Sequence, residues 1–197
     1  MNNDLILQLY SRPETVFTLD EISQLFPGIT LKSLRNRLYY FNKVGKLKRL
    51  HHGVYVKENY NPLELANKLY KPSYISLETV LVKSGVVFQH YETIFVVSYL
   101  TRAVSVGTID IQYRQTKGPV LTNTSGIEHK DGYFIASTER AFLDAVYIYK
   151  DYHFDNLGVI DWKEVSELKK IYHSNSLEKR VEEYQKLYKE DYGKQSL

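Results

Sequence analysis

Apolar residues in the first third of the chain recur at helical spacing, and proline and glycine interrupt them. The first run, residues 5–10, predicts a short helix that ends at Arg12, because the residue before a proline avoids helical geometry. A second helix is predicted from Thr18, where Thr-Leu-Asp-Glu has the form of a capping box between Thr18 and Glu21. This helix should end at the Pro-Gly pair 27–28.

A third helix is predicted from Thr30, a good N-cap residue, to Gly45, which suits the left-handed position after a helix. At about 100° per residue, the helix has one apolar and one polar face. The apolar face is expected to hold Leu31, Leu34, Leu38, Phe41 and Val44. The opposite face holds Lys32, Asn36, Tyr39, Tyr40 and Lys43, flanked by Ser33 and Arg35. Arg37 should lie nearer the apolar side, as an internal ion-pair partner.

Two short strands are predicted after Gly45, in the segments KLKRLHH and VYVK, with a turn at His52-Gly53. Three helices followed by a basic hairpin are typical of a winged helix-turn-helix, and the short connection between the second and third helices fits its tight turn. We therefore expect an N-terminal winged helix-turn-helix domain over residues 1–60.

The remaining residues, 61–197, alternate helical and strand patterns and predict a second, mixed domain. A connecting helix should start at Pro62 and stop before Pro72, and Ser76 is expected to cap a short helix that Gly85 closes. Residues 92–137 are rich in Val, Ile, Tyr and Thr and predict three or four strands, with a hairpin turn at Asp131-Gly132.

Helical spacing returns after the strands. Ser137 or Thr138 should cap a helix that runs to residue 150, and two further helices are expected over 161–173 and 176–192. An apolar thread through Val181, Tyr184 and Tyr188 could pack on the same domain or on a partner. The predicted fold class is α+β: a winged helix-turn-helix followed by a mixed α/β domain with C-terminal helices.

The charge pattern changes the picture. The chain has 26 Lys and Arg against 23 Asp and Glu, a net charge of +3, yet residues 30–57 hold eight basic residues, two histidines and no acidic residue. The rest of the chain keeps 18 basic against all 23 acidic residues, a net charge of −5. Such a local patch indicates a polyanionic partner, although a charge run can also be a merely solvated helix face.

Double-stranded DNA fits this patch, because the recognition helix of a helix-turn-helix lies in the major groove. Ser33 and Asn36 can hydrogen-bond base edges, and Lys32, Arg35 and Lys43 can meet phosphates or guanine. On the hairpin, Lys48, Arg49, His51 and His52 can meet the flanking backbone or the minor groove. Tyr39 and Tyr40 either contact DNA or pack beneath the hairpin. His51 and His52 lack further ligands nearby, so no metal site is predicted.

Several classes of protein are excluded or disfavoured. The chain has no cysteine, which excludes disulfides, thiolate metal sites and cysteine nucleophiles. It shows no signal-peptide pattern and no apolar run near the roughly 20 residues of a membrane span, so a cytoplasmic protein without membrane contact is expected.

An enzyme is not expected either, because nucleophile-elbow, phosphate-loop and zinc-helix motifs are missing, and no cofactor is predicted. Two alternatives stay open: a ligand-responsive regulator whose second domain shifts DNA binding, and a metal-dependent nuclease built on Glu128, Asp131 and Glu139.

Three segments in register carry a resemblance to a known family: GKLKRLHHGVYV at 45–56, YISLETVLVKSGVV at 74–87 and ASTERAFLDAVYI at 136–148. Over residues 15–150 the chain resembles the AbiEi-like antitoxins of type IV, abortive-infection toxin-antitoxin systems. It departs from them at Thr138, where proline is usual, and at Thr79-Val80 in place of a small pair.

The resemblance implies an autorepressor that binds its own promoter through the winged helix. It also implies that the C-terminal domain counteracts a nucleotidyltransferase-type toxin, with or without direct contact. The family-motif positions of that domain are Ser76, Glu78, Glu139, Arg140 and Asp144. A simpler interpretation is that these residues support the fold, as first-turn carboxylates and an i, i+4 ion pair.

Overall fold

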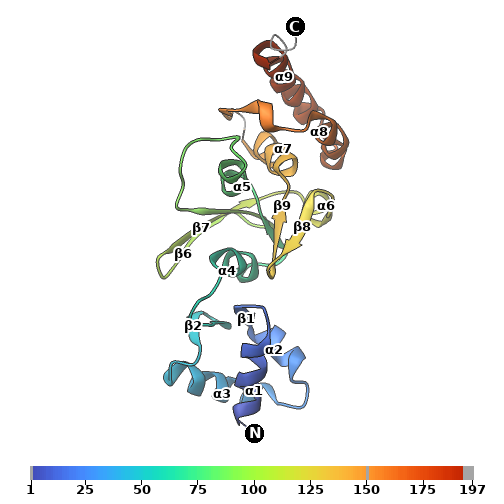
Figure 1. Ribbon diagram of the computed structural model, residues 1–197. Helices are drawn as coiled ribbons and strands as arrows, with labels where there is room; N and C mark the ends of the chain where they lie inside the picture. Colours follow the sequence, from blue (N-terminus) through green and yellow to red (C-terminus); the bar gives the residue numbers. More distant parts are fainter. Residues whose placement is uncertain (1, 150, 193–197) are drawn as a thin grey trace.

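The computed structural model describes residues 2–149 and 151–192. It has an elongated shape: the N-terminal helices lie at one end, a six-stranded sheet lies in the middle, and the last helices lie at the other end (Figure 1). The predicted α+β class is confirmed, since helices and two separate sheets share the chain. None of the helices in the described ranges is long and apolar enough to cross a membrane.

The N-terminal unit contains three helices and a small sheet. Its elements are α1 (Asn2–Ser11), β1 (Val16–Thr18), α2 (Leu19–Leu25), α3 (Leu31–Lys43), β2 (Lys48–His51) and β3 (Val54–Val56). The strands are antiparallel in the order β1-β3-β2. The helices and the hairpin were predicted, whereas β1 was not, because three residues are too short to display alternation.

Local capping explains where the predicted helices begin. The Thr18 hydroxyl accepts the Glu21 amide hydrogen at 3.2 Å, and the Glu21 carboxylate accepts the Thr18 amide hydrogen at 2.8 Å, so the capping box is confirmed. The Thr30 hydroxyl accepts the Ser33 amide hydrogen and caps α3. Gly45 follows α3 with a φ of +73°, the left-handed conformation expected there.

The apolar face of α3 is narrower than predicted. Leu34, Leu38 and Phe41 are buried in the N-terminal core, but Leu31 and Val44 are 50% and 45% exposed. Leu31 is the first residue of α3 and Val44 is its C-cap. Only the central turns of the helix face the core, so the two outer positions of the predicted stripe are wrong.

The second unit is organised around a mixed sheet of order β6-β7-β5-β4-β9-β8, in which β4 pairs parallel with β9 and β5 with β7. Its elements are α4 (Pro62–Leu69), β4 (Ser73–Ile75), α5 (Glu78–Lys83), β5 (Ile94–Ser98), β6 (Arg102–Val106), β7 (Ile109–Gln115), α6 (Gly118–Thr122), β8 (Ile127–Lys130) and β9 (Tyr133–Ala136). Residues 92–137 hold five strands rather than three or four, because Gly107, with a φ of +64°, turns one long run into a hairpin. The predicted turn at Asp131-Gly132 joins β8 and β9.

The remaining helices are α7 (Thr138–Ile148), the short η1 (Leu157–Val159), α8 (Trp162–Leu168), η2 (Lys169–Tyr172) and α9 (Asn175–Tyr192). The sheet lies between α4 on one side and α7 on the other, and α8 and α9 pack beyond α7 (Figure 1). The Ser137 hydroxyl caps α7. The thread on α9 packs on its own unit: Val181 is buried, and the ring centroid of Tyr184 lies 5.8 Å from that of Phe142. Of the two partners considered for this helix, the structure therefore favours the chain itself.

The two units meet through a small apolar cluster. Val16 of β1 and Val54 and Val56 of β3 pack with Leu65 of α4 and with Val106 at the end of β6. The β6–β7 hairpin thus rests against the sheet of the N-terminal unit, beside α4. This cluster joins the three-stranded sheet of the N-terminal unit to α4 and to the six-stranded sheet.

Candidate nucleic-acid interface

The polar face of α3 projects into solvent. Tyr39 and Tyr40 are 67% and 51% exposed. Lys32, Arg35, Asn36 and Lys43 are also exposed, and Ser33 is half-buried at the first turn. All seven predicted positions of this helix therefore lie on one accessible surface or at its border, while Arg37 is half-buried and forms no ion pair with any residue in the described ranges. The prediction of an internal ion pair for Arg37 is not supported.

The hairpin of β2 and β3 brings further cationic groups beside this helix. Lys48, Arg49 and His52 are exposed, and His51 is half-buried. The pairing register shifts between Arg49 and His51, and the Arg49 guanidinium lies 3.0 Å from Nδ1 of His52. A bulge of this kind turns a strand and redirects its side chains.

A hollow of about 600 Å³ separates α3 from the hairpin. It is lined by Leu19, Arg35, Asn36, Tyr39, Asn42, Arg49, His52, Gly53 and Tyr55, and none of these is acidic. Five of the predicted site residues line it together, whereas Lys32, Ser33, Tyr40, Lys43, Lys48 and His51 do not. We call this hollow the α3–hairpin groove.

Asn42 is a member of the groove that the sequence did not single out. Its side-chain oxygen accepts the Arg49 amide hydrogen at 2.8 Å and so joins the end of α3 to β2. The available signal was its position, three residues after Tyr39 on the same helix face. Because an asparagine there could equally be solvated, only the hairpin's location reveals its role.

The two tyrosines can now be placed. Tyr39 lines the groove and is not covered by the hairpin, while the ring of Tyr40 lies 6.0 Å from that of Phe41 and remains half-exposed. Neither ring is enclosed beneath the hairpin. Both are accessible to a partner that lies along α3.

Three of the five family-motif positions meet inside the second unit. Arg140 and Asp144 are fully buried on α7, with Nε of the arginine 3.6 Å from a carboxylate oxygen. Asp144 also accepts hydrogen bonds from the hydroxyls of Ser76 at 2.8 Å, Tyr172 at 2.7 Å and Tyr74 at 3.1 Å. We call these five residues the buried Arg140–Asp144 cluster.

Most polar groups of the cluster find partners within the fold, although the buried Arg140 Nε has no hydrogen-bond partner and meets Asp144 only as an ion pair. The Arg140 guanidinium donates to the backbone oxygens of Ser125 and Val120 and to the Tyr74 hydroxyl. Burial raises the pKa of Asp144, although Arg140 and the hydroxyl donors oppose the shift. The cluster thereby ties β4, α6, α7 and η2 together, as fold support would require.

The prediction that Ser76 caps a helix is wrong. The N-cap of α5 is Leu77, which has a φ of +54° and makes no side-chain cap, since the Ser76 hydroxyl points to Asp144 instead. Tyr74 and Tyr172 were missed. Tyr74 is the first residue of the YISLETVLVKSGVV segment, whereas Tyr172 lies in the helical tail and has no distinguishing pattern.

The other two family-motif positions lie apart from the cluster. Glu78 is buried and accepts a hydrogen bond from the Tyr149 hydroxyl at 3.3 Å, and burial raises its pKa. Glu139 is buried and accepts the Asp161 amide hydrogen at 3.2 Å. Each carboxylate serves a different contact within the second unit.

A nuclease-like metal site gains no support. Glu128 and Asp131 are exposed on the β8–β9 hairpin, while Glu139 is buried on α7. Across residues 2–149 and 151–192, no group of three or more His, Asp or Glu side chains is arranged to hold a metal ion.

Compared with known proteins, the chain matches no protein-family model and no curated protein.

Proposed function

We propose that the N-terminal unit is a winged helix-turn-helix that binds double-stranded DNA of the protein's own promoter. The observation that carries this proposal is the α3–hairpin groove, which lies between two exposed basic elements and has no acidic residue in its lining. A carboxylate there would repel phosphate, whereas lysine and arginine release counterions and add affinity. The element order helix, strand, helix, helix and hairpin agrees with this class.

In this proposal α3 lies in the major groove. Its early polar residues, Ser33 and Asn36, face base edges, and asparagine pairs most naturally with adenine. Lys32, Arg35 and Lys43 hold phosphates or guanine, and Tyr39 and Tyr40 contact the backbone beside them. The hairpin follows the flanking backbone through Lys48, Arg49, His51 and His52, so that one strand of DNA enters the α3–hairpin groove.

We further propose that the protein is a cytoplasmic antitoxin of the type IV kind, acting against a nucleotidyltransferase-type toxin. The three motifs in register support this role. The burial of Ser76, Arg140 and Asp144 supports a structural role for those motif positions, because groups with no exposed surface cannot touch a toxin. Neutralisation would then act through the outer surface of the second unit or through the toxin's pathway.

DNA binding is tested by fluorescence anisotropy with a duplex of the upstream region and a scrambled duplex, at several salt concentrations. We expect preferential binding to the upstream duplex. Asn36→Ala should lower the preference by about 1 to 3 kcal/mol, because a bidentate contact to one base is lost. Lys163→Ala, an exposed lysine on α8, is the matched control. If neither duplex binds at low salt, the proposal fails.

The antitoxin role is tested separately: it predicts that a nucleotidyltransferase is encoded beside this chain, and the two proteins are then co-expressed. Growth rescue is expected from the full chain and from the Asn36→Ala variant when both are expressed from a foreign promoter. Continued growth arrest in both cases would refute the antitoxin role and leave the DNA-binding proposal intact.

A further inference from the structure

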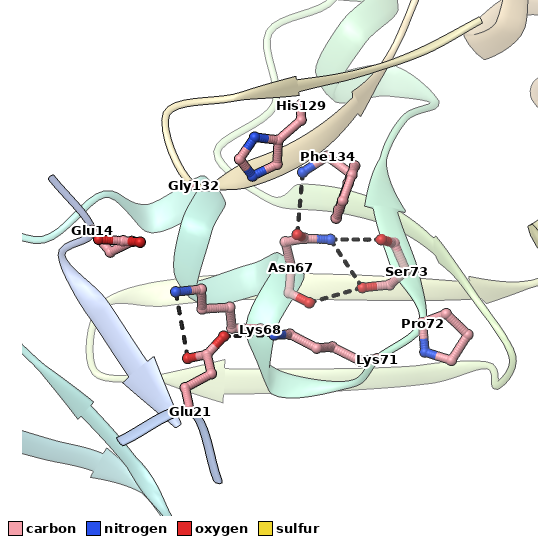
Figure 2. Close-up of a pocket in the computed structure, with 10 residues that line it drawn as sticks. All are labelled: Glu14, Glu21, Asn67, Lys68, Lys71, Pro72, Ser73, His129, Gly132 and Phe134. Atoms are coloured by element: carbon pink, nitrogen blue, oxygen red, sulfur yellow. Dashed lines mark hydrogen bonds and ion pairs between the residues drawn. The ribbon is translucent and has the colours of Figure 1, made fainter. Parts of the chain in front are cut away.

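A pocket of about 570 Å³ opens where the N-terminal unit meets the β8–β9 hairpin (Figure 2). Small-molecule sites usually measure about 300 to 1,000 Å³, and they commonly lie between domains. Glu14 and Glu21 approach the pocket from the N-terminal segment, and His129 and Phe134 approach it from the hairpin. This junction pocket shares no lining residue with the α3–hairpin groove.

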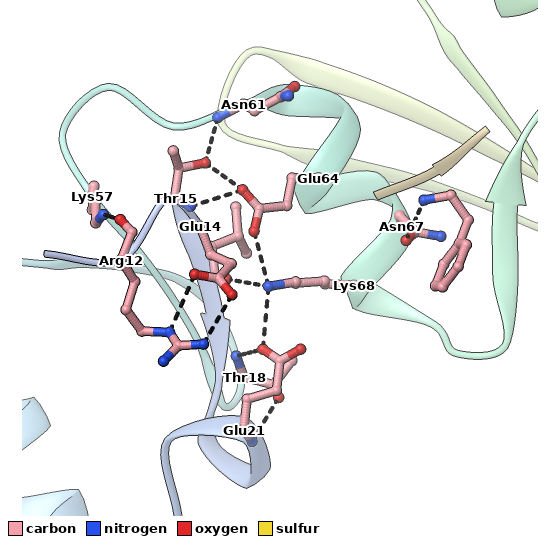
Figure 3. Close-up of polar contacts among 12 residues, drawn as sticks. Arg12, Glu14, Thr15, Thr18, Glu21, Lys57, Asn61, Glu64, Asn67 and Lys68 are labelled. Carbon is pink, nitrogen blue, oxygen red and sulfur yellow. Dashed lines mark hydrogen bonds and ion pairs between the residues drawn. The ribbon is translucent and has the colours of Figure 1, made fainter. Parts of the chain in front are cut away.

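The floor of the junction pocket is a polar network around Lys68 (Figure 3). The Lys68 side chain is only 7% exposed, and its ammonium lies 2.9 Å from Glu64 and 3.5 Å from Glu21 and donates to the Val16 carbonyl oxygen at 2.6 Å. Glu64 in turn accepts from the amide and the hydroxyl of Thr15. Lys68 is thus engaged by one hydrogen bond and two ion pairs on the floor, while the Glu64 oxygen nearest to it, Oε1, forms the ion pair but no hydrogen bond.

The mouth of the pocket is different, because it carries an ion pair that water can reach. Lys71 Nζ lies 2.7 Å from a Glu21 carboxylate oxygen, and the side chains are 51% and 29% exposed. Burial works against ionisation of Glu21, but hydrogen bonds from Lys71 and from the Thr18 amide, with the charge of Lys68, hold its pKa below the ordinary value. Glu21 is therefore a carboxylate at neutral pH, and Lys71 keeps two N–H donors free of this pair.

One wall of the pocket is aromatic and open. The Phe134 ring is 46% exposed, and the His129 ring packs beside it with centroids 4.9 Å apart. The Asn67 side-chain oxygen accepts the Phe134 amide hydrogen at 3.1 Å and fixes this strand, and Pro72 continues the apolar surface. An apolar body can thus pack against Phe134 while polar groups reach the mouth.

We propose that the junction pocket binds an aromatic α-amino acid. The ligand's ammonium pairs with Glu21, its carboxylate pairs with Lys71, and its ring packs against Phe134 and Pro72. A zwitterion can enter an existing ion pair and leave both protein charges compensated. An amine alone can pair only with Glu21, and an acid alone can pair only with Lys71, so each of these ligands forms one of the two charged contacts that the amino acid forms.

The test uses the full chain without DNA, so its result is independent of the proposed DNA binding. Isothermal titration calorimetry would measure L-phenylalanine and L-tryptophan, with 2-phenylethylamine and 3-phenylpropionate as analogues that keep one charge each. We expect a zwitterion to bind at least about tenfold more tightly than both analogues, since each analogue lacks one charged contact. No binding by either amino acid, or equal binding by an analogue, would overturn the proposal.

Variants locate the bound amino acid. Lys71→Met should weaken binding by about tenfold or more, because the carboxylate loses its charged partner. Phe134→Ala removes the exposed ring and should weaken it as well, while Lys163→Met should bind like the unchanged protein. Each variant is first shown to keep the unchanged melting temperature within a few degrees. Unaltered affinity in folded Lys71→Met and Phe134→Ala would place the ligand elsewhere and reject this site.

Discussion

The surface of α3 and the buried Arg140–Asp144 cluster both contain charged residues and tyrosines, but the charges are paired in the cluster and exposed to solvent on α3. In the cluster, Nε of the arginine lies 3.6 Å from a carboxylate oxygen of the aspartate, and hydroxyls and carbonyl oxygens provide further contacts to both side chains. On α3 and its hairpin, the cations lie among tyrosines, amides and histidines, without a carboxylate in the groove lining. A charge that the fold compensates supports the fold, and a set of like charges left in solvent favours a partner of opposite sign.

The largest expected effect comes from breaking the cluster. Asp144→Ala leaves the Arg140 guanidinium buried without its carboxylate and should lower the free energy of unfolding by about 3 to 5 kcal/mol. Urea denaturation followed by circular dichroism measures the loss. Glu128→Gln, an exposed carboxylate on β8, is the control and should change stability by less than about 0.5 kcal/mol. Equal stability of both variants would show that the cluster does not support the fold.

Removing exposed cations from α3 and the hairpin should affect DNA binding rather than stability. Lys43→Ala and Lys48→Ala should leave stability nearly unchanged but flatten the dependence of log affinity on log salt by about one unit each, as expected for one lost phosphate contact. Anisotropy titrations with the upstream duplex at four or more salt concentrations measure the slope. Lys163→Ala should keep the original slope. If neither Lys43→Ala nor Lys48→Ala changes the slope, neither lysine contacts a phosphate of the DNA.

The hydrogen bond between Asn42 and the Arg49 amide sharpens the comparison, because it is a structural contact within the proposed binding surface. Asn42→Ala should reduce stability by about 1 kcal/mol, the usual contribution of one hydrogen bond. It should also weaken duplex binding by about tenfold, because the hairpin loses its fixed position. Asn59→Ala, an exposed asparagine outside the groove, should do neither. Full affinity in Asn42→Ala would show that the hairpin holds its position without this bond.

The sequence predicted what local chemistry controls and missed what distant contacts control. The Thr18 capping box and the Asp131-Gly132 turn depend on residues within a few positions, so their patterns were sufficient. Tyr172 reaches Asp144 across 28 positions, and no local pattern announces that contact. Ser76 shows the same limit: a serine before a helical run normally caps it, but a buried carboxylate on α7 offered a stronger partner.

The same reasoning applies to the two candidate sites. Net charge and helix periodicity predicted the face of α3, because an exposed face depends on one element alone. The junction pocket needed the N-terminal segment, α4 and the β8–β9 hairpin to come together, and residues from Glu14 to Phe134 contribute to it. Nothing in the spacing of those residues indicates a common site.

The smallest expected effect concerns pH and Glu21, which joins the two units through Lys71 and also caps α2. Its folded-state pKa lies below the ordinary value of a glutamate, because hydrogen bonds from Lys71 and the Thr18 amide and the charge of Lys68 outweigh the effect of burial, so the unfolded state binds protons more readily as the pH falls. Glu21 therefore stabilises the fold above that value, and its contribution is lost as the pH drops through the folded-state pKa.

Glu21→Gln should consequently reduce stability at pH 7 and narrow the difference in unfolding free energy between neutral and acidic solution. Urea titrations at a series of pH values, from pH 7 down to below the ordinary pKa of a glutamate, measure both quantities. Glu58→Gln, an exposed carboxylate outside the junction, should retain the unchanged protein's pH dependence. Parallel curves for Glu21→Gln and the unchanged protein would mean that the ion pair at the pocket mouth adds nothing to the fold. The Glu21–Lys71 pair would then resemble the solvent-exposed charges of α3, which are not expected to stabilise the fold, rather than the paired charges of the Arg140–Asp144 cluster.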